Sequence, residues 1–168
     1  MRIAVLFGGT SEERDVSIAS AAQIIPALRG LGHEVFAVDT ATGRLPPADE
    51  KQLLASGVAP EPPSTIAMEQ VRGRAIAFAP SASDIRSADV VFLALHGGAG
   101  EDGRLQAMLD LAALAYTGSN HIASAAAMDK DLSKRLFRSA GVPTADWIMA
   151  PVTAAGIEST LGWPRWSR

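Results

Sequence analysis

The chain has 168 residues, no cysteine and a formal net charge of -3. This charge gives no reason to expect nucleic acid as a partner, and without cysteine the chain forms neither disulfides nor thiolate metal sites. Because the opening apolar run at Ile3–Phe7 is too short for a signal-peptide core or a membrane span, we expect a cytoplasmic protein of one domain or slightly more.

Apolar runs typical of buried strands alternate with helical periodicity along the chain. Continuous β-branched runs that end in glycine indicate strands buried on both faces, whereas apolar residues three and four apart indicate helices. The predicted elements are strands at 3–7 and 33–39 with a helix at 16–31 between them, a helix at 48–55, strands at 75–79 and 89–95, a helix at 105–114, a strand at 115–116, helices at 119–127 and 128–141, a strand after Pro143 and a helix at 152–161. This order predicts an α/β fold with an open parallel sheet flanked by helices.

Two glycine-rich loops follow predicted strands, where ligands of open α/β sheets usually bind. The first loop, GGTSEERD from Gly8, lacks the spacing of phosphate loops, and its acidic residues would repel an anion. The Glu13 carboxylate would suit a cationic ligand, such as the ammonium of an amino acid. The competing interpretation is structural, because Thr10 and Glu13 have the spacing of a capping box and acidic residues stabilise the first turn of a helix.

The second loop, HGGAGEDG from His96, contains four glycines, which predict tight bends of the backbone. Two interpretations of His96 stay open: it contacts a substrate carboxylate or orients Glu13, or it is satisfied by local backbone. Glu101 and Asp102 precede a predicted helix and are expected to cap it.

Lys130 and Lys134 lie one helical turn apart and therefore share a face of the predicted helix. Two ammonium groups on one face can hold a polyphosphate, although lysines on helices more often just face solvent. No set of metal-ligating residues is predicted.

Three segments, in this order and spacing, resemble the D-alanine–D-alanine ligase family of the ATP-grasp superfamily. They are VLFGGTSEERDVS from Val5, VVFLALHGGAGEDGRLQAMLDLAALAYTGS from Val90 and ASAAAMDKDLSKRLFRSAGVPTADW from Ala123. The resemblance covers nearly the whole chain. It implies a Rossmann-like pre-ATP-grasp domain at residues 1–127, which binds substrate, followed by the beginning of a truncated ATP-grasp domain at residues 128–168.

The resemblance also implies an activity, the ATP- and Mg²⁺-dependent ligation of two D-alanines for peptidoglycan synthesis, in which this chain holds the first D-alanine. By this resemblance Glu13 is the catalytic residue that binds the substrate ammonium, and Val16, Ser17 and His96 also bind substrate. Lys130 is expected to contact an ATP phosphate. Whether the chain forms a homodimer stays open.

The chain departs from the family pattern after Pro164, where only RWSR follows. The family's second ATP-binding lysine, phosphate loop and magnesium ligands would follow there, so we expect the chain alone not to turn over. We also expect exposed apolar surface at residues 128–140 and around Trp163 and Trp166. The alternative that stays open is a non-catalytic module that binds an amino acid or a partner, whereas the acidic first loop disfavours a dinucleotide-binding oxidoreductase.

Overall fold

The computed structural model describes residues 1–58, 64, 66, 69–70 and 83–161. The predicted strand at 75–79 and the tail with Trp163 and Trp166 lie outside these residues. The chain forms two compact units, Met1–Ala125 and Ala126–Arg168, and each is described by itself. Within the described residues, no helix combines the length and apolar character that a membrane crossing requires.

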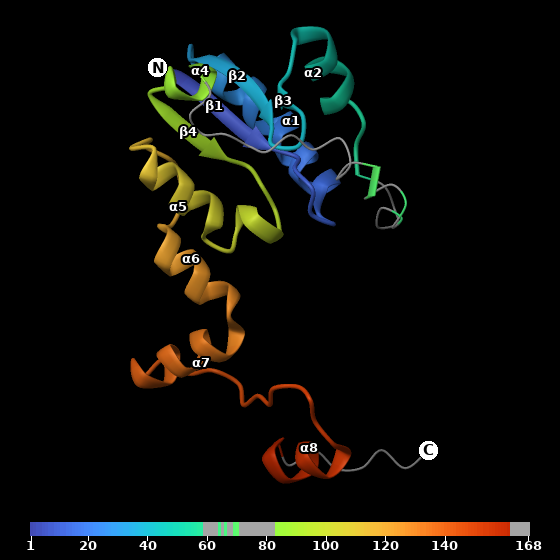
Figure 1. Ribbon diagram of the computed structural model, residues 1–168, viewed down its shortest axis with the longest axis vertical. Coiled ribbons are helices and arrows are strands. Elements are labelled where there is room, and N and C mark those ends of the chain that lie inside the picture. The colour runs from blue at the N-terminus through green and yellow to red at the C-terminus, as the bar shows by residue number, and fades with distance from the viewer. Residues whose placement is uncertain (59–63, 65, 67–68, 71–82, 162–168) are drawn as a thin grey trace. The chain divides into compact units, whose positions relative to one another are not determined.

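A four-stranded sheet in the order β3-β2-β1-β4 forms the centre of the first unit (Figure 1). The central strand β1 (Arg2–Phe7) pairs in parallel with β2 (Glu34–Asp39) on one side and with β4 (Val90–Leu93) on the other. The short edge strand β3 (Gly43–Arg44) runs antiparallel to β2. The predicted open parallel α/β sheet is therefore confirmed, with one antiparallel edge strand that the sequence did not predict.

Helices connect and cover these strands. In the described part of the first unit they are α1 (Arg14–Gly30), α2 (Pro47–Leu54), α4 (Ser83–Arg86), the 3-10 turn η1 (Gly98–Gly100), α5 (Arg104–Leu111) and α6 (His121–Met128), whose last residues belong to the second unit. The crossover helix α1 contains Pro26, as predicted, and ends before Gly32, whose φ of +82° suits a glycine. The predicted strand at 115–116 is reduced to a single parallel bridge between Tyr116 and Val91.

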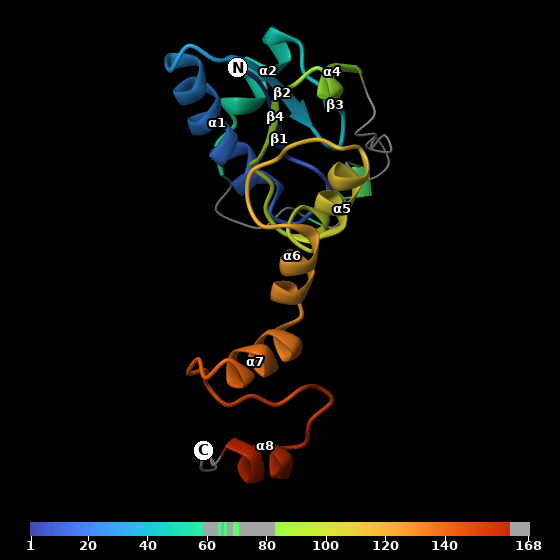
Figure 2. The same cartoon turned by 90° about the vertical axis from the view of Figure 1, so that its left-hand side faces the viewer.

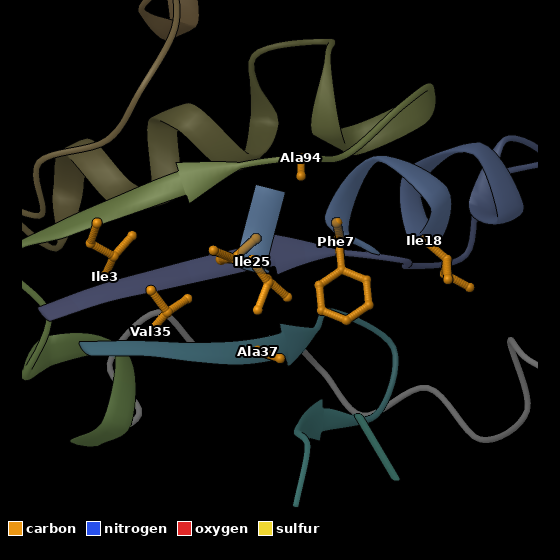
Figure 3. Close-up of a cluster of buried hydrophobic side chains, with 9 residues drawn as sticks. Ile3, Phe7, Ile18, Ile25, Val35, Ala37 and Ala94 are labelled. Atoms are coloured by element: carbon orange, nitrogen blue, oxygen red, sulfur yellow. The ribbon is translucent and has the colours of Figure 1, made fainter. Parts of the chain in front are cut away.

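Apolar side chains pack on both faces of the sheet. Alternate residues of β1 face opposite sides, so that Ile3, Val5 and Phe7 join α1 in one cluster, while Ala4 and Leu6 join α5 in the other. Figure 2 shows α1 and α5 on opposite sides of the sheet, and Figure 3 shows the α1-side cluster. Burial on both faces explains why β1 is apolar throughout instead of alternating.

The second unit contains α7 (Lys130–Ser139) and α8 (Ala154–Leu161). Asp129 caps α7 by accepting a hydrogen bond from the Leu132 N–H at 3.0 Å. The predicted strand after Pro143 is wrong, because residues 142–149 form none. The Trp147 ring in this segment instead lies 4.4 Å from the guanidinium carbon of Arg138, and its N–H donates to Asp131.

The amphipathic helix α7 leaves apolar side chains exposed, as predicted. Leu132, Leu136 and Phe137 are 42%, 50% and 47% exposed. Exposed apolar surface of this kind promotes association. We therefore expect the chain to self-associate. The assignment of residues 1–127 and 128–168 to two functional domains stays a prediction.

Candidate functional site

A cavity of about 640 Å³ lies between the loop after β1 and the loop after β4. Its wall consists of residues 8–13 and 95–100, together with Thr40 and three residues of α5, all within the first unit. Because β1 and β4 are parallel neighbours, both loops lie at the same end of the sheet (Figure 1). The two glycine-rich loops therefore face each other across one cavity.

The Glu13 carboxylate belongs to the cavity wall and does not cap its own helix. Helix α1 begins at Arg14, so Glu13 occupies the N-cap position, where its side chain makes no capping hydrogen bond. The capping-box interpretation, which needs Thr10 at the N-cap, is therefore wrong. The carboxylate lies beside the second loop instead, since a Cβ on Gly97 would be 3.4 Å from Glu13 Cδ.

Serine hydroxyls fix the first loop against the second. Ser11 Oγ donates to the carbonyl oxygen of His96 at 2.6 Å. The buried Ser17 accepts from the Gly8 N–H at 2.8 Å and donates to the Ala94 carbonyl at 2.7 Å. The structure thus places Ser17 behind the loop and outside the cavity wall, where its hydroxyl sets the spacing between the loops.

His96 lines the cavity, and a side chain from α1 holds its ring. Its Nε2 lies 3.0 Å from Ser20 Oγ, and its Nδ1 lies 4.0 Å from Glu101 Oε1. The interpretation that local backbone satisfies the ring is therefore wrong. The contact with Ser20 orients the imidazole and leaves Nδ1 beyond hydrogen-bond distance of Glu101.

The acidic residues before α5 play different roles. Asp102 accepts a hydrogen bond from the backbone N–H of Arg104 at 3.1 Å and also pairs with the guanidinium of Arg104. The guanidinium lowers the pKa of the Asp102 carboxyl. The prediction that Asp102 caps α5 is wrong in position, because Gly103 is the N-cap and no side chain caps the helix, while Asp102 binds the Arg104 N–H from one residue earlier. The Glu101 carboxylate lies near His96 instead of capping the helix.

A buried ion pair lies behind the first loop. The Asp39 carboxylate at the end of β2 is fully buried, and the largely buried Arg14 guanidinium lies 2.5 Å from it. Burial raises the pKa of the Asp39 carboxyl, but the hydrogen bonds from Arg14, Gly9 and Ala41 outweigh it and hold the pKa below its ordinary value. The sequence reasoning missed this pair, although an acidic residue that ends an otherwise apolar strand was a usable signal.

The stability of the first unit is expected to fall in acid through Asp39. Because the folded-state pKa of Asp39 lies below its unfolded value, the stabilisation is fully present above the unfolded pKa and is lost as the pH falls through the folded one. We expect the parent chain to lose unfolding free energy more steeply than Asp39→Asn as the pH falls below the unfolded pKa of an aspartate, about 4. Urea titrations at each pH measure the two slopes, and parallel slopes would contradict the prediction.

The remaining predicted site residues are Val16 of the first unit and Lys130 of the second. Val16 is 41% exposed on α1 and does not line the cavity. Lys130, in the second unit, donates from Nζ to the Ala127 carbonyl at 3.1 Å, and Lys134 donates to the Ala145 carbonyl. Within residues 1–58 and 83–161, no three His, Asp or Glu side chains gather as a metal site would require.

The geometry of the two loops coincides with a family match. Residues 2–119 match the family model described as the D-ala D-ala ligase N-terminus. The chain belongs to the D-alanine–D-alanine ligase family. Its relatives include the D-alanine–D-alanine ligase of Bradyrhizobium sp. strain BTAi1, which is 41% identical over 159 residues, and that of Aquifex aeolicus, which is 36% identical over 147 residues.

These alignments cover most of the chain but less than half of each ligase. They span 91% and 88% of this chain, and 43% and 38% of the Bradyrhizobium and Aquifex ligases. The solved D-alanine–D-alanine ligase of Coxiella burnetii superposes with a TM-score of 0.65 at 31% identity, over 95% of this chain and 48% of that structure. The fold and the family therefore agree for the part of the ligase that this chain spans.

Proposed function

We propose that this chain holds the first D-alanine of a cytoplasmic, ATP-dependent D-alanine–D-alanine ligation. In this proposal the Glu13 carboxylate accepts hydrogen bonds from the substrate ammonium. The observation that carries it is the position of Glu13, which lines the cavity without capping its own helix. Membership of the ligase family supports the same assignment.

The charge of the cavity favours a cationic group at this end. Glu12 and Glu13 both line it, and the Arg104 guanidinium, which also lines it, is paired with Asp102. A hydrogen bond between an ammonium and a carboxylate contributes about 1.5 to 3 kcal/mol. His96, oriented by Ser20, is proposed as a second polar contact to the substrate.

ATP, with Mg²⁺, would supply the phosphoryl group that activates the substrate carboxylate. Lys130 is the proposed phosphate contact on this chain, and its exposed ammonium fits an anionic group. The first-unit residues Glu13 and His96 would bind and orient the amino acid during this step, so their contribution is positioning. A homodimer remains a prediction.

The proposed ammonium contact can be tested by calorimetry with D-alanine and with propionate, which lacks the ammonium. The parent chain should prefer D-alanine, and Glu13→Gln should weaken D-alanine binding roughly 10- to 100-fold while leaving propionate unchanged. Glu12→Gln is the matched control, because it removes an equal charge from the same loop. Equal D-alanine affinity in the parent and in Glu13→Gln would contradict the proposal.

A module that binds an amino acid without reacting is a second candidate. The described residues that line the cavity all belong to the first unit, and this geometry serves binding without a nucleotide. Phosphate release from ATP in the presence of D-alanine would rule out this second candidate, because a module that only binds an amino acid releases no phosphate.

A further inference from the structure

We propose that Arg14 and Asp39 form a positioning pair that holds the first glycine loop in the conformation in which Glu13 faces the cavity. This inference rests on the proposed function for its effect on binding, because the pair would act on the ligand only through Glu13. Neither residue was a predicted site residue, and neither lines the cavity.

Asp39 is the common acceptor for two loops. Its buried carboxylate accepts hydrogen bonds from the backbone N–H groups of Gly9, at 3.0 Å, and Ala41, at 2.9 Å, and from the Thr42 hydroxyl at 3.1 Å. Arg14 adds two more hydrogen bonds, at 2.9 and 2.5 Å. One side chain at the end of β2 thus ties the loop after β1 to the loop after β2.

Arg14 completes the hold on Gly9. Its Nη1 donates to the Gly9 carbonyl at 2.9 Å as well as to Asp39. The N–H and the C=O of Gly9 are therefore both bound by this pair. Gly9 has a φ of +76° and Gly8 a φ of +71°. Because glycine adopts positive and negative φ about equally readily, the contacts from Arg14 and Asp39 hold the loop in one of several accessible conformations.

The direction of Glu13 follows from this anchor. Glu13 immediately precedes Arg14, and without a capping bond its own side chain does not fix the first turn. The guanidinium anchors that turn on the β2 side, while the Glu13 carboxylate lies beside Gly97 of the opposite loop. By engaging Arg14, Asp39 also keeps the guanidinium from neutralising Glu13, so that the Glu13 charge stays available to a cationic ligand.

The binding test uses calorimetry of D-alanine with the whole chain. Arg14→Lys retains the charge but loses the planar guanidinium that binds two groups at once. Made in the parent chain, it should weaken D-alanine binding about tenfold; made in the Glu13→Gln variant, it should weaken binding no further. Asp39→Asn should behave in the same way. Arg2→Lys is the matched control at the amino end of β1, where Arg2 pairs with Glu34, and it should bind like the parent.

A merely structural pair would give a different pattern. Parent-like affinity in Arg14→Lys, or an equal loss with and without Glu13, would overturn the inference even if Glu13 binds the ammonium. Absence of Glu13-dependent binding in the parent would instead overturn the proposed function.

In that case amide hydrogen exchange still decides whether the pair holds the loop. Faster exchange at Gly9 in Arg14→Lys and Asp39→Asn, with the β1 amides unchanged, supports it. Unchanged exchange at Gly9 overturns it.

Discussion

Replacing Phe7 with alanine is expected to lower the unfolding free energy of the first unit by about 4 kcal/mol. Phe7 ends β1 and is fully buried, and its ring packs in the cluster with Ile18 and Ile25 of α1 (Figure 3). Removing the ring loses its transfer free energy and leaves a cavity beneath the glycine loop. The effect should therefore reach the functional site as well as the core.

Hydrogen exchange of the β1 and β2 amides is the appropriate measurement for this variant. The tryptophans of the chain, at positions 147, 163 and 166, all belong to the second unit, so their fluorescence would report on the wrong part. Leu31→Ala is the control, because Leu31 is 74% exposed and its loss should cost less than about 0.5 kcal/mol. Similar losses for the two variants would contradict the packing described for β1.

Replacing Gly8 with alanine is the second large effect, with an expected cost of about 3 kcal/mol. Gly8 has a φ of +71°, which penalises any residue with a Cβ. The new methyl group would also lie 2.5 Å from Asp39 Oδ1 and 2.7 Å from Arg14 Nη1. Both side chains are held in hydrogen bonds, so they cannot move away without breaking contacts to the loop.

Gly32→Ala separates the two causes of this cost. Gly32 has a φ of +82° but nothing within 4 Å of an added Cβ, so it should lose only the backbone contribution, about 1 kcal/mol. Urea unfolding of both variants, monitored by hydrogen exchange of the β1 amides, gives the difference between their losses of unfolding free energy. Equal costs at Gly8 and Gly32 would show that the close packing around Asp39 and Arg14 contributes nothing.

The central part of the fold was predictable because its signals are strong and local. The apolar run that became β1 and the helical periodicity of α1 each predict one element without regard to the rest of the chain. The edge strand at Gly43–Arg44 was not predictable, since two residues carry no pattern and the strand exists only through its pairing with β2. The strand expected after Pro143 failed because Trp147 packs against α7 side chains, a tertiary contact that a local pattern does not encode.

The functional site shows the same division. The charge of the first loop and the glycines of the second singled out Glu13 and His96 as candidates, and the pairing of β1 with β4 brings both to one cavity. The positions of Ser17 and Ser20 depend on which face of α1 meets β4, so the sequence did not reveal that they tether the second loop. The pair of Arg14 and Asp39 was missed because the two residues lie 25 positions apart and meet only after β1 and β2 have paired.

A crystal structure of the chain with D-alanine would show whether Glu13 binds the ammonium. We expect the D-alanine ammonium within hydrogen-bond distance of the Glu13 carboxylate, in the cavity between the loops that follow β1 and β4. D-alanine bound elsewhere on the first unit, or a Glu13 side chain turned back onto the amides of α1 while the ligand is bound, would contradict it.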